Sequence, residues 1–470
     1  MRRPAFCRVC SAAVMLWLLS SCAPKPQTMR SRPVSERLPE KNGWIQVRLA
    51  GTPREIGFQH GSLLAGEILD AKKATQLLLK HTTAKDWDFY RNAAREMLWP
   101  KIEEEYRQEL QGIADGLRSK GFEVDVWDVT AMNASMELGS YYVPEYDKQH
   151  GIKTPDTATA PEHCSAFVAT GSYTKDGKVV VAHNNWSEYV IGERWNIVFE
   201  ITPEHGNRIF MDGFPGLIQS GDDFAMNSAG LIVTETTIGS FHGFDPNGIP
   251  EFVRARKAVQ YAANIDQFDR IMRTGNNGGY ANNWLLADSN TGEIASLELG
   301  LKNVTLQRKK DGFFAGSNLP ENQKLIQEET DFHASPGDSS SARKTRWRQL
   351  LEENKGKIDV ALAQQFLADN YDVILKKPQP SERTLCGRVD LSPRGLPQWQ
   401  KPYGPAGAVQ NKATDASMTA RMSFVAAYGP LCGPEFRVDE FTAKHKEFAW
   451  QSPSLRDMPS KPWATFQAAR

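Results

Sequence analysis

The feature that most constrains the fold is a change of hydrophobic pattern at Cys164. Between residues 44 and about 145, apolar residues recur mostly at helical spacing. From Cys164 onward, short β-branched runs such as "SAFVATG", "GKVVVAHN" and "GLIVTETTI" predict strands, and helical patterns return later in the chain. Runs of strands separated from runs of helices are typical of an α+β fold with antiparallel sheets.

The composition excludes several classes of function. The chain has 470 residues, 40% of them hydrophobic, and a formal net charge of zero, so it is long enough to bury a large core. The balanced charge and the lack of a long basic run give no support for a nucleic-acid partner. The histidines form no metal-ligand spacing, and the one Cys-x-x-Cys motif, Cys7 to Cys10, lies in the leader described next. We therefore expect no metal and no cofactor.

The N-terminus has the pattern of an export signal. Arg2 and Arg3 precede an apolar stretch, residues 12–19, that is too short to span a bilayer. The following Leu-Ser-Ser-Cys resembles a bacterial lipoprotein signal, which implies cleavage before Cys22 and lipid modification of that cysteine. A plain secretory signal is the alternative. The lipoprotein interpretation predicts a lipid-anchored protein of the cell envelope, on the periplasmic face or in the outer membrane of a Gram-negative cell.

Three cysteines lie beyond the leader. Cys386 and Cys432 both occur in loops rich in glycine or proline, so we expect a disulfide between them. That pairing leaves Cys164 as a free thiol in an oxidising compartment. A free thiol in an exported protein suggests a chemical role.

The segment after Cys164 predicts a hairpin that folds back onto the thiol. Lys-Asp-Gly-Lys at 175–178 is a tight-turn signal. A strict two-residue turn places Cys164 opposite Tyr189, whereas a wider loop places it opposite Asn184. The wider loop surrounds the thiol with the polar stretch His183–Trp186. A thiol needs a base, which is either His183, as in papain-like enzymes, or its own α-amino group, if the chain is cut before Cys164.

Several motifs resemble a known family. The stretch 163–186, "HCSAFVATGSYTKDGKVVVAHNNW", resembles the start of the mature chain in phospholipase B-like proteins. These are N-terminal nucleophile (Ntn) hydrolases, related to penicillin V acylase, bile-salt hydrolases and the fungal acyl-CoA:6-aminopenicillanate acyltransferase. Similar motifs follow in "GFQHGSLLAGEI", "MNSAGLIVTETTIG", "NNWLLAD" and residues 407–433. The resemblance implies a four-layer αββα sandwich, with two antiparallel sheets between helical layers.

The resemblance also implies autoproteolysis between His163 and Cys164. Cys164 Sγ then attacks the substrate, and its α-amine shuttles the proton. His183 matches a histidine of the phospholipase B-like branch, with a role in orienting the nucleophile or in the cleavage step, unless it is structural. Trp186 stands where the acylases have an aspartate that holds the α-amine, so it is expected to shape the pocket, and the positioning of the amine stays open. Asn184 or Asn185 could supply polarity there.

The remaining candidates lie further along the chain. Thr237 is expected on the oxyanion side, in preference to its neighbours Glu235 and Thr236, although it could be an ordinary strand residue. Asn318 is expected to donate to an oxyanion, or else to serve a left-handed turn. Arg343 and Arg346 lie one helical turn apart, and the sequence does not decide which is the active-site arginine or whether both form a solvated face.

These predictions divide the chain into five parts. They are a signal peptide (1–22), a disordered tether (23–43), a helical pro-segment or N-terminal part of the Ntn domain (44–163), a catalytic Ntn-hydrolase core (164–437) and a surface tail (438–470). The expected function is hydrolysis of ester or amide bonds in small acyl-bearing molecules, with lipid deacylation favoured. Acyl transfer, a penicillin-acylase-type amidase and a non-catalytic envelope lipoprotein that keeps the fold for binding are the alternatives. We expect the cleaved pro-segment to stay docked through its apolar faces.

Overall fold

The structure is a computed structural model that describes Met1 and residues 35–153, 163–221, 224–392 and 404–469. The predicted signal peptide, Cys22 and most of the predicted tether lie outside the described residues. Every element below belongs to one compact unit, which spans residues 33–470. In the part of the chain that is described, no helix combines the length and apolar character needed to cross a bilayer.

Two large sheets dominate the fold, as the α+β prediction requires. Within the described residues the larger sheet has nine strands in the order β1-β2-β5-β6-β7-β8-β9-β10-β11, and the smaller has six in the order β12-β3-β4-β15-β16-β17. The strands of the larger sheet are β1 (Glu36–Arg37), β2 (Ile45–Gly51), β5 (Ile197–Pro203), β6 (Ile209–Gly213), β7 (Ala225–Asn227), β8 (Leu231–Thr237), β9 (Asn282–Asp288), β10 (Glu293–Leu299) and β11 (Val304–Lys309). Those of the smaller sheet are β12 (Gly312–Gly316), β3 (His163–Thr170), β4 (Val180–Glu188), β15 (Ala406–Asp415), β16 (Ser423–Tyr428) and β17 (Ala464–Gln467).

The larger sheet is mixed, so the expectation of two purely antiparallel sheets is wrong. β2 pairs with β5 in parallel, with Ile45 opposite Ile197, while the other ladders of both sheets are antiparallel. A parallel pair needs a long crossover between its strands. Here the N-terminal helices and the β3–β4 hairpin supply that crossover.

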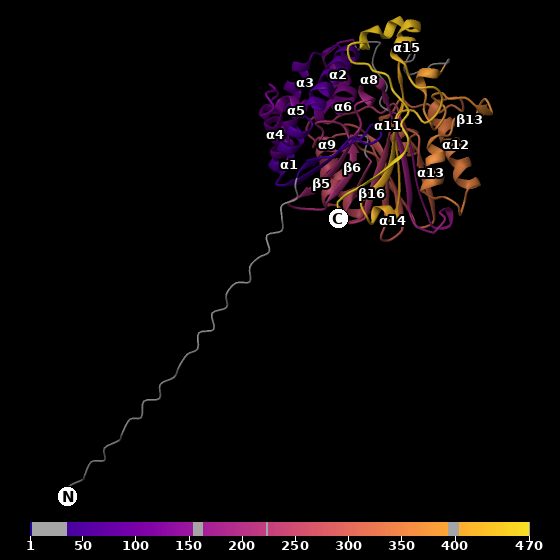
Figure 1. Cartoon of the computed structure of the whole chain (residues 1–470), viewed down its shortest axis with the longest axis horizontal. Helices are drawn as coiled ribbons and strands as arrows, with labels where there is room; N and C mark the ends of the chain where they lie inside the picture. The colour runs from indigo at the N-terminus through magenta and orange to yellow at the C-terminus, as the bar shows by residue number, and fades with distance from the viewer. Residues whose placement is uncertain (2–34, 154–162, 222–223, 393–403, 470) are drawn as a thin grey trace. The chain divides into compact units, whose positions relative to one another are not determined.

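The two sheets pack face to face, and helices cover their outer faces. Between the sheets, Phe424 of β16 packs against Phe210 of β6, with ring centroids 5.0 Å apart. On the smaller sheet, Phe167 of β3 packs against Trp347 of helix α12 at 5.3 Å. On the larger sheet, Trp284 of β9 packs against Phe268 of helix α10 at 5.5 Å. Figure 1 shows α12 and α13 in orange on one side and the indigo helices α1 to α5 on the other.

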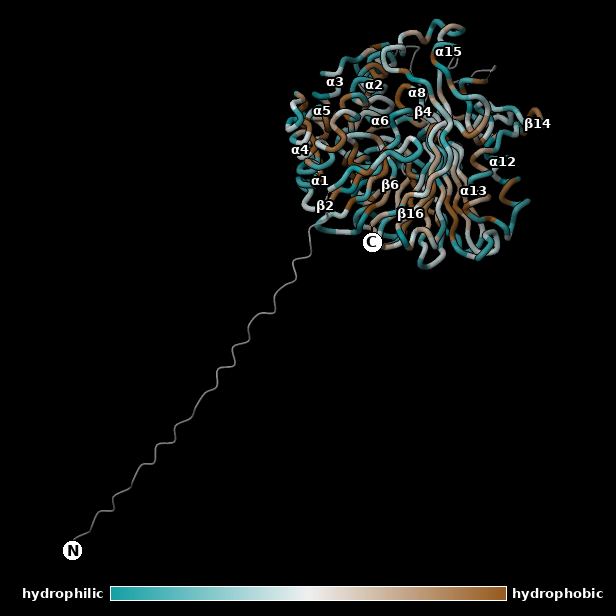
Figure 2. Tube along the Cα trace, in the orientation of Figure 1, coloured by the Kyte–Doolittle hydropathy of each residue, from teal (hydrophilic) through white to brown (hydrophobic). Residues whose placement is uncertain are grey.

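The helices divide into an N-terminal group and a later group. The first group is α1 (Pro53–Leu63), α2 (Ala65–Thr83), α3 (Trp87–Ala93), α4 (Glu104–Ser119), α5 (Val126–Asn133), α6 (Ser135–Glu137) and α7 (Val143–His150). The second is α8 (Tyr189–Gly192), α9 (Glu251–Tyr261), α10 (Ile265–Arg273), α11 (Gln323–Glu329), α12 (Ser339–Glu353), α13 (Val360–Leu367), α14 (Ala416–Thr419) and α15 (Val438–Lys444). Figure 2 shows hydrophobic residues along the strands and near α13, and hydrophilic residues in many peripheral loops.

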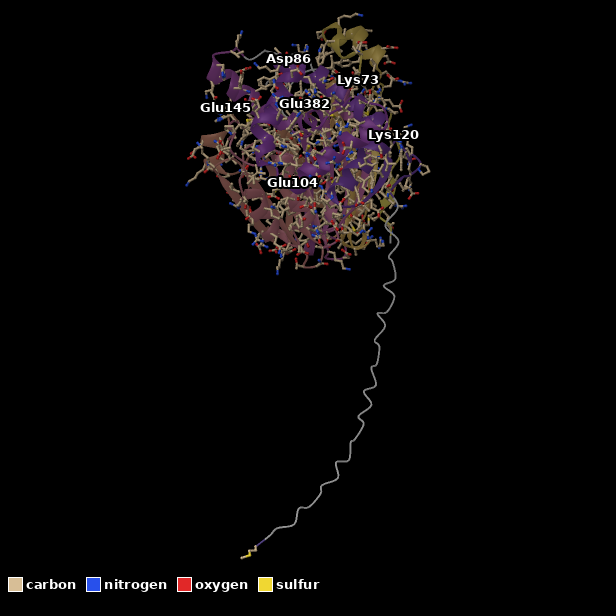
Figure 3. The ribbon with its side chains drawn as sticks, turned by 90° about the vertical axis from the view of Figure 1, so that its left-hand side faces the viewer. Lys73, Asp86, Glu104, Lys120, Glu145 and Glu382 are labelled. Carbon is tan, nitrogen blue, oxygen red and sulfur yellow. A yellow bond between two sulfur atoms is a disulfide. The ribbon has the colours of Figure 1, made fainter. Side chains whose placement is uncertain are left out.

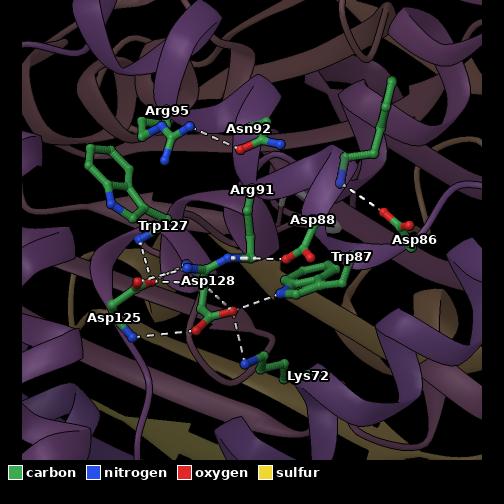
Figure 4. Close-up of polar contacts among 11 residues, drawn as sticks. Lys72, Asp86, Trp87, Asp88, Arg91, Asn92, Arg95, Asp125, Trp127 and Asp128 are labelled. Atoms are coloured by element: carbon green, nitrogen blue, oxygen red, sulfur yellow. Dashed lines mark hydrogen bonds and ion pairs between the residues drawn. The ribbon is translucent and has the colours of Figure 1, made fainter.

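The N-terminal helices are held together by close backbone contact and by a polar network. A Cβ on Gly57 of α1 would lie 2.0 Å from the carbonyl oxygen of Glu109 in α4, so only glycine permits this packing. Further along, Asp128 of α5 accepts hydrogen bonds from Trp87 Nε1 at 2.7 Å and pairs with Lys72 at 2.9 Å (Figure 4). The outer surface of this layer is charged, as exposed Glu104 shows in Figure 3.

Two segments expected to lie outside the folded domain contribute strands to its sheets. Glu36 and Arg37, placed by composition in the tether, form β1 and pair with Arg48 and Val47 of β2. In the predicted surface tail, β17 adds to the edge of the smaller sheet, and Phe466 is only 2% exposed. The alternation in Ala-Thr-Phe-Gln, which turns Ala464 and Phe466 inward, explains the strand.

Candidate active site

The β3–β4 hairpin brings the thiol to its polar neighbours, in a register one residue away from the wider-loop prediction. Cys164 lies opposite Asn185, and neither Asn184 nor Tyr189 is its partner, so both expected registers are wrong. A turn of 3-10 helix at Gly171–Tyr173 lengthens the connection, and paired residues resume at Val180. Because side chains alternate along a strand, this shift puts Asn185 rather than Asn184 on the same face as Cys164.

The Cys164 thiol is fully buried beside a carboxylate. Its Sγ lies 3.5 Å from Oε1 of Glu235, in β8, and 3.8 Å from Oδ1 of Asn185. Glu235 is also fully buried, and its Oε1 accepts a hydrogen bond from Tyr280 Oη at 3.2 Å. With its side-chain amide in the hydrogen-bonding orientation, Asn282 donates to Oε2 of Glu235 at 2.8 Å. The sequence disfavoured Glu235, yet its carboxylate touches the sulfur.

His183 lies in the same cluster. One of its ring nitrogens, Cys164 Sγ and a carboxylate oxygen of Glu235 all lie within 4.8 Å of one another. The imidazole stacks on Phe224, with centroids 6.4 Å apart and planes inclined by 18°. In β15, Lys412 pairs with His183 across the strands and forms a fully buried ion pair with Asp212 at 2.7 Å. Sequence spacing could not reveal this cluster, because its members come from three strands.

Asn318 holds the backbone nitrogen of Cys164. The Cys164 N–H donates to Asn318 Oδ1 at 3.1 Å, and Asn318 Nδ2 donates to the carbonyl of Thr237 at 2.8 Å. The residue has a φ of 66°, so it also serves the left-handed turn that was the alternative interpretation. In this geometry the amide oxygen faces the Cys164 nitrogen, and the amide N–H group expected to donate to an oxyanion is bound to the Thr237 carbonyl.

Arg343, and not Arg346, contacts Cys164. Its Nη1 donates to the Cys164 carbonyl at 2.6 Å and to Ser165 Oγ at 2.9 Å, and its Nη2 donates to Asn318 Oδ1 at 3.0 Å. The side chain is fully buried, and burial lowers the pKa of its guanidinium to about 9. Arg346 instead forms an ion pair with Asp369 at 2.7 Å.

Trp186 supports this arginine. The guanidinium of Arg343 lies 4.4 Å from the centre of the Trp186 ring, a cation–π contact, and Trp186 Nε1 donates to Asn184 Oδ1 at 3.0 Å. In the β3–β4 ladder Trp186 lies opposite His163, whose side chain is outside the described residues. Trp186 therefore packs against Arg343, while the Cys164 backbone nitrogen is bound by Asn318.

Thr237 contributes a hydroxyl group next to this network. Its side chain is buried, and within the described residues Thr237 Oγ1 has no hydrogen-bond partner. Its carbonyl is fixed by the Asn318 amide. The hydroxyl is thus a donor that is not committed to another described group.

The disulfide loop lies next to Asn184 and Trp186 of β4. The structure contains a disulfide between Cys386 and Cys432, the pair favoured by the sequence, and Cys164 is the free cysteine of the described residues. Asn184 Nδ2 donates to the Leu385 carbonyl at 2.6 Å, and a Cβ on Gly387 would lie 2.2 Å from the Trp186 ring. The loop around Cys386 therefore packs directly against Asn184 and Trp186.

Comparison with known proteins identifies the family. The family model described as Phospholipase B matches residues 65–462. "Putative phospholipase B-like 1" of Caenorhabditis elegans is 25% identical over 333 residues, which cover 64% of this chain and 57% of that protein. "Acyl-coenzyme A:6-aminopenicillanic-acid-acyltransferase 40 kDa form" of Emericella nidulans is 26% identical over 262 residues, covering 54% and 63%.

Solved structures give a weaker likeness. The penicillin V acylase of Agrobacterium tumefaciens matches with a TM-score of 0.33 and 13% identity, covering 56% of this chain and 83% of that chain. Among curated relatives, the matches span about half of the relatives' own length, 57% for the nematode protein and 52% for human "Putative phospholipase B-like 2".

Proposed function

The chain belongs to the phospholipase B family, and from this premise we propose that it is a self-cleaving cysteine hydrolase of ester or amide bonds in acyl-bearing small molecules. The observation that carries the proposal is the environment of Cys164. Its sulfur lies beside a carboxylate, and its backbone nitrogen and carbonyl are each held by a separate buried side chain. The contacts between helices and the two sheets support the αββα architecture of Ntn hydrolases.

The first step is maturation. Cys164 Sγ attacks the carbonyl carbon of His163, and the thiol proton passes to a nearby base, for which Glu235 at 3.5 Å is placed. The bond between His163 and the Cys164 nitrogen breaks, the nitrogen takes up a proton, and a thioester joins His163 to Sγ. Water then hydrolyses the thioester, which leaves a carboxylate on His163 and a free α-amine and thiol on Cys164.

The second step is turnover. The α-amine has a pKa of about 8 in an unperturbed chain, so it suits proton transfer near neutral pH. It takes the thiol proton as Sγ attacks the acyl carbonyl, and it returns the proton to the leaving alcohol or amine. Water then releases the acid from the acyl-thioester. Asn318 Oδ1 would hold the amine, Arg343 would fix the Cys164 carbonyl, and the Thr237 hydroxyl would donate to the oxyanion.

The substrate class is proposed from the family. Its description, phospholipase B, favours removal of fatty acyl chains, and the fungal relative's name favours transfer of an acyl group from a thioester to an amine. Both outcomes share the acyl-thioester and differ only in the acceptor. We further propose that Cys22 carries a lipid that anchors the protein in the cell envelope, close to lipid substrates.

Intact-mass analysis and N-terminal sequencing test the maturation step. We expect the wild-type protein to give two fragments, the second beginning Cys-Ser-Ala, and Cys164→Ala to remain a single inactive chain. An uncut wild-type chain that hydrolyses substrate would favour the papain-like mechanism instead. Cleavage that persists in Cys164→Ala would overturn the proposal.

A substrate panel then tests the reaction. The cleaved protein is assayed with phospholipids, N-acyl amides, penicillins and an acyl-thioester with an added amine. Hydrolysis of phospholipids is expected. Turnover only of the thioester with the amine would establish acyl transfer, and binding without any turnover would favour a non-catalytic module.

A further inference from the structure

We propose that Cys164, His183 and Glu235 form a Zn²⁺-binding site, through which the ion reversibly blocks the thiol. The three ligand atoms are Cys164 Sγ, an imidazole nitrogen of His183 and a carboxylate oxygen of Glu235. The proposal concerns metal binding, so it holds whether or not the chain is the hydrolase proposed above.

The spacing of the ligand atoms fits zinc. With Zn–S of about 2.3 Å, Zn–O of about 2.0 Å and a tetrahedral angle, the sulfur and the oxygen should lie about 3.5 Å apart. In the structure Cys164 Sγ and Glu235 Oε1 are 3.5 Å apart. The His183 nitrogen lies within 4.8 Å of both other ligand atoms, close enough for the three residues to share one ion.

The ligand chemistry selects the metal. A thiolate and an imidazole favour Zn²⁺ over Mg²⁺ or Ca²⁺, which prefer oxygen ligands. With neutral His183, a thiolate and a carboxylate carry two negative charges, which one Zn²⁺ neutralises. All three residues are fully buried, and compensation of charge matters most where water is excluded. Three protein ligands leave a fourth position, for water or for the Asn185 amide oxygen, 3.8 Å from Sγ.

The ligands come from rigid elements of both sheets. Cys164 and His183 lie in β3 and β4 of the smaller sheet, and Glu235 lies in β8 of the larger sheet. A bound ion would therefore cross-link the two sheets and raise the thermal stability of the fold. It would also occupy the sulfur lone pair, so neither cleavage before Cys164 nor attack on a substrate could proceed.

Cobalt provides a direct readout of the ligands. The purified protein is stripped with a chelator and titrated with Co²⁺, which is expected to produce a near-ultraviolet thiolate-to-metal band and intense visible bands of a tetrahedral site. Zn²⁺ should displace the Co²⁺ and raise Tm, and Mg²⁺ should do neither. Cys164→Ser should abolish the thiolate band while keeping the fold.

Matched variants identify the other ligands. Loss of a group that hydrogen-bonds to a metal ligand typically weakens metal binding by ~10- to 100-fold. Glu235→Gln and His183→Asn change the ligands themselves, so each should weaken Zn²⁺ binding by more than that. Glu188→Gln, which changes a carboxylate of β4 outside the cluster, should bind Zn²⁺ as the wild type does. Circular dichroism of each variant checks that the fold is intact.

Three results would overturn the proposal. The first is the absence of the thiolate band, and the second is wild-type Zn²⁺ affinity in folded Glu235→Gln. The third is a loss of activity on chelation that is reversed by adding Zn²⁺, because the ion would then be needed for turnover rather than blocking the thiol. If the protein cleaves itself normally but shows no thiolate band, the proposed metal site is wrong and the proposed function is unaffected. If the protein is uncut and inactive but still shows the thiolate band, the proposed function is wrong and the metal site is unaffected.

Discussion

At the scale of the residue, Arg343 is the group on which the site geometry depends most. It is a fully buried cation whose hydrogen-bond acceptors among the described residues are all neutral: the carbonyls of Cys164 and Ser317, the hydroxyls of Ser165 and Ser339, and Asn318 Oδ1. Only a planar guanidinium can serve so many acceptors in fixed directions. Arg343 thereby links β3 to the Asn318 turn.

Lysine ends in an ammonium group, which cannot make the directed hydrogen bonds of the planar guanidinium. Replacing Arg343 by lysine should therefore displace Cys164. In Arg343→Lys we expect self-cleavage and turnover to slow by about 100-fold, as a displacement of roughly 1 Å in an active site can cost. Arg346→Lys, one helical turn away, should leave both rates near wild type. A time course of cleavage on gels and the kcat of the mature enzyme measure these effects. Wild-type rates in Arg343→Lys would show that Arg343 does not position Cys164.

At the scale of the element, the buried carboxyl group of Glu137 joins α6 to the start of α9. Oε2 of Glu137 accepts hydrogen bonds from Asn277 Nδ2 at 2.7 Å and from the Glu251 backbone N–H at 3.2 Å. Burial raises the pKa of Glu137 to about 7, and burial also raises the pKa of Glu251 well above its usual range. In the folded protein these groups therefore keep a proton at a pH where the unfolded chain has lost it.

This shift should make the fold less stable as the pH rises. Below about pH 4.3, where a glutamate is protonated even in the unfolded chain, Glu137 has no pH-dependent effect on stability. Between there and its folded pKa of about 7, the folded state binds more protons, so stability falls as the pH rises. For Glu137 the loss is of the order of 3 kcal/mol.

Denaturant unfolding at a series of pH values measures this loss. Glu137→Gln, which cannot ionise, should flatten the decline between about pH 4.3 and 7, and the same change at exposed Glu104 should not. His60 acts in the opposite direction over a partly overlapping range. Burial lowers its pKa to about 3, so the stability it contributes above its unfolded pKa of about 6.5 is lost progressively as the pH falls toward 3. A Glu137→Gln profile identical to that of the wild type would contradict the assignment.

At the scale of the whole molecule, the segment before Cys164 is built into the larger sheet. β2 lies between β1 and β5, so its hydrogen bonds join residues on both sides of the proposed cleavage point. In the helical layer, Glu109 of α4 forms a buried ion pair with Arg256 of α9 at 3.2 Å, and Lys257 pairs with Glu103 at 2.6 Å. Cleavage before Cys164 would break one bond of the chain and leave these contacts intact.

The two fragments should therefore stay together after maturation. We expect them to co-elute in size-exclusion chromatography, at the volume of uncut Cys164→Ala, and to separate only in denaturant. Analysis of the peak by mass spectrometry identifies both fragments. Release of the N-terminal fragment in native buffer would show that it is a removable pro-segment.

The sequence by itself determined the features that depend on local pattern. The strand and helix periods predicted the α+β class, and the turn signal predicted the hairpin that approaches the thiol. The number and positions of the cysteines predicted the Cys386–Cys432 disulfide and left Cys164 as the free thiol. These inferences succeed because a period or a turn is a property of neighbouring residues. The β1 and β17 strands were missed because two to four residues at a sheet edge carry too little pattern to stand out from a tether or a tail.

Only the tertiary structure decided which side chains meet. Asn185 rather than Asn184 lies opposite Cys164, and Arg343 rather than Arg346 contacts it. Glu235 lies beside the sulfur, and the Asn318 side-chain oxygen accepts from the Cys164 backbone nitrogen. Cys164 and Glu235 are 71 residues apart and belong to different sheets, so their contact depends on how those sheets pack. A one-residue shift of register or one turn of helix changes which group faces the thiol, and such small displacements are set by the packing of the whole core rather than by any local run of residues.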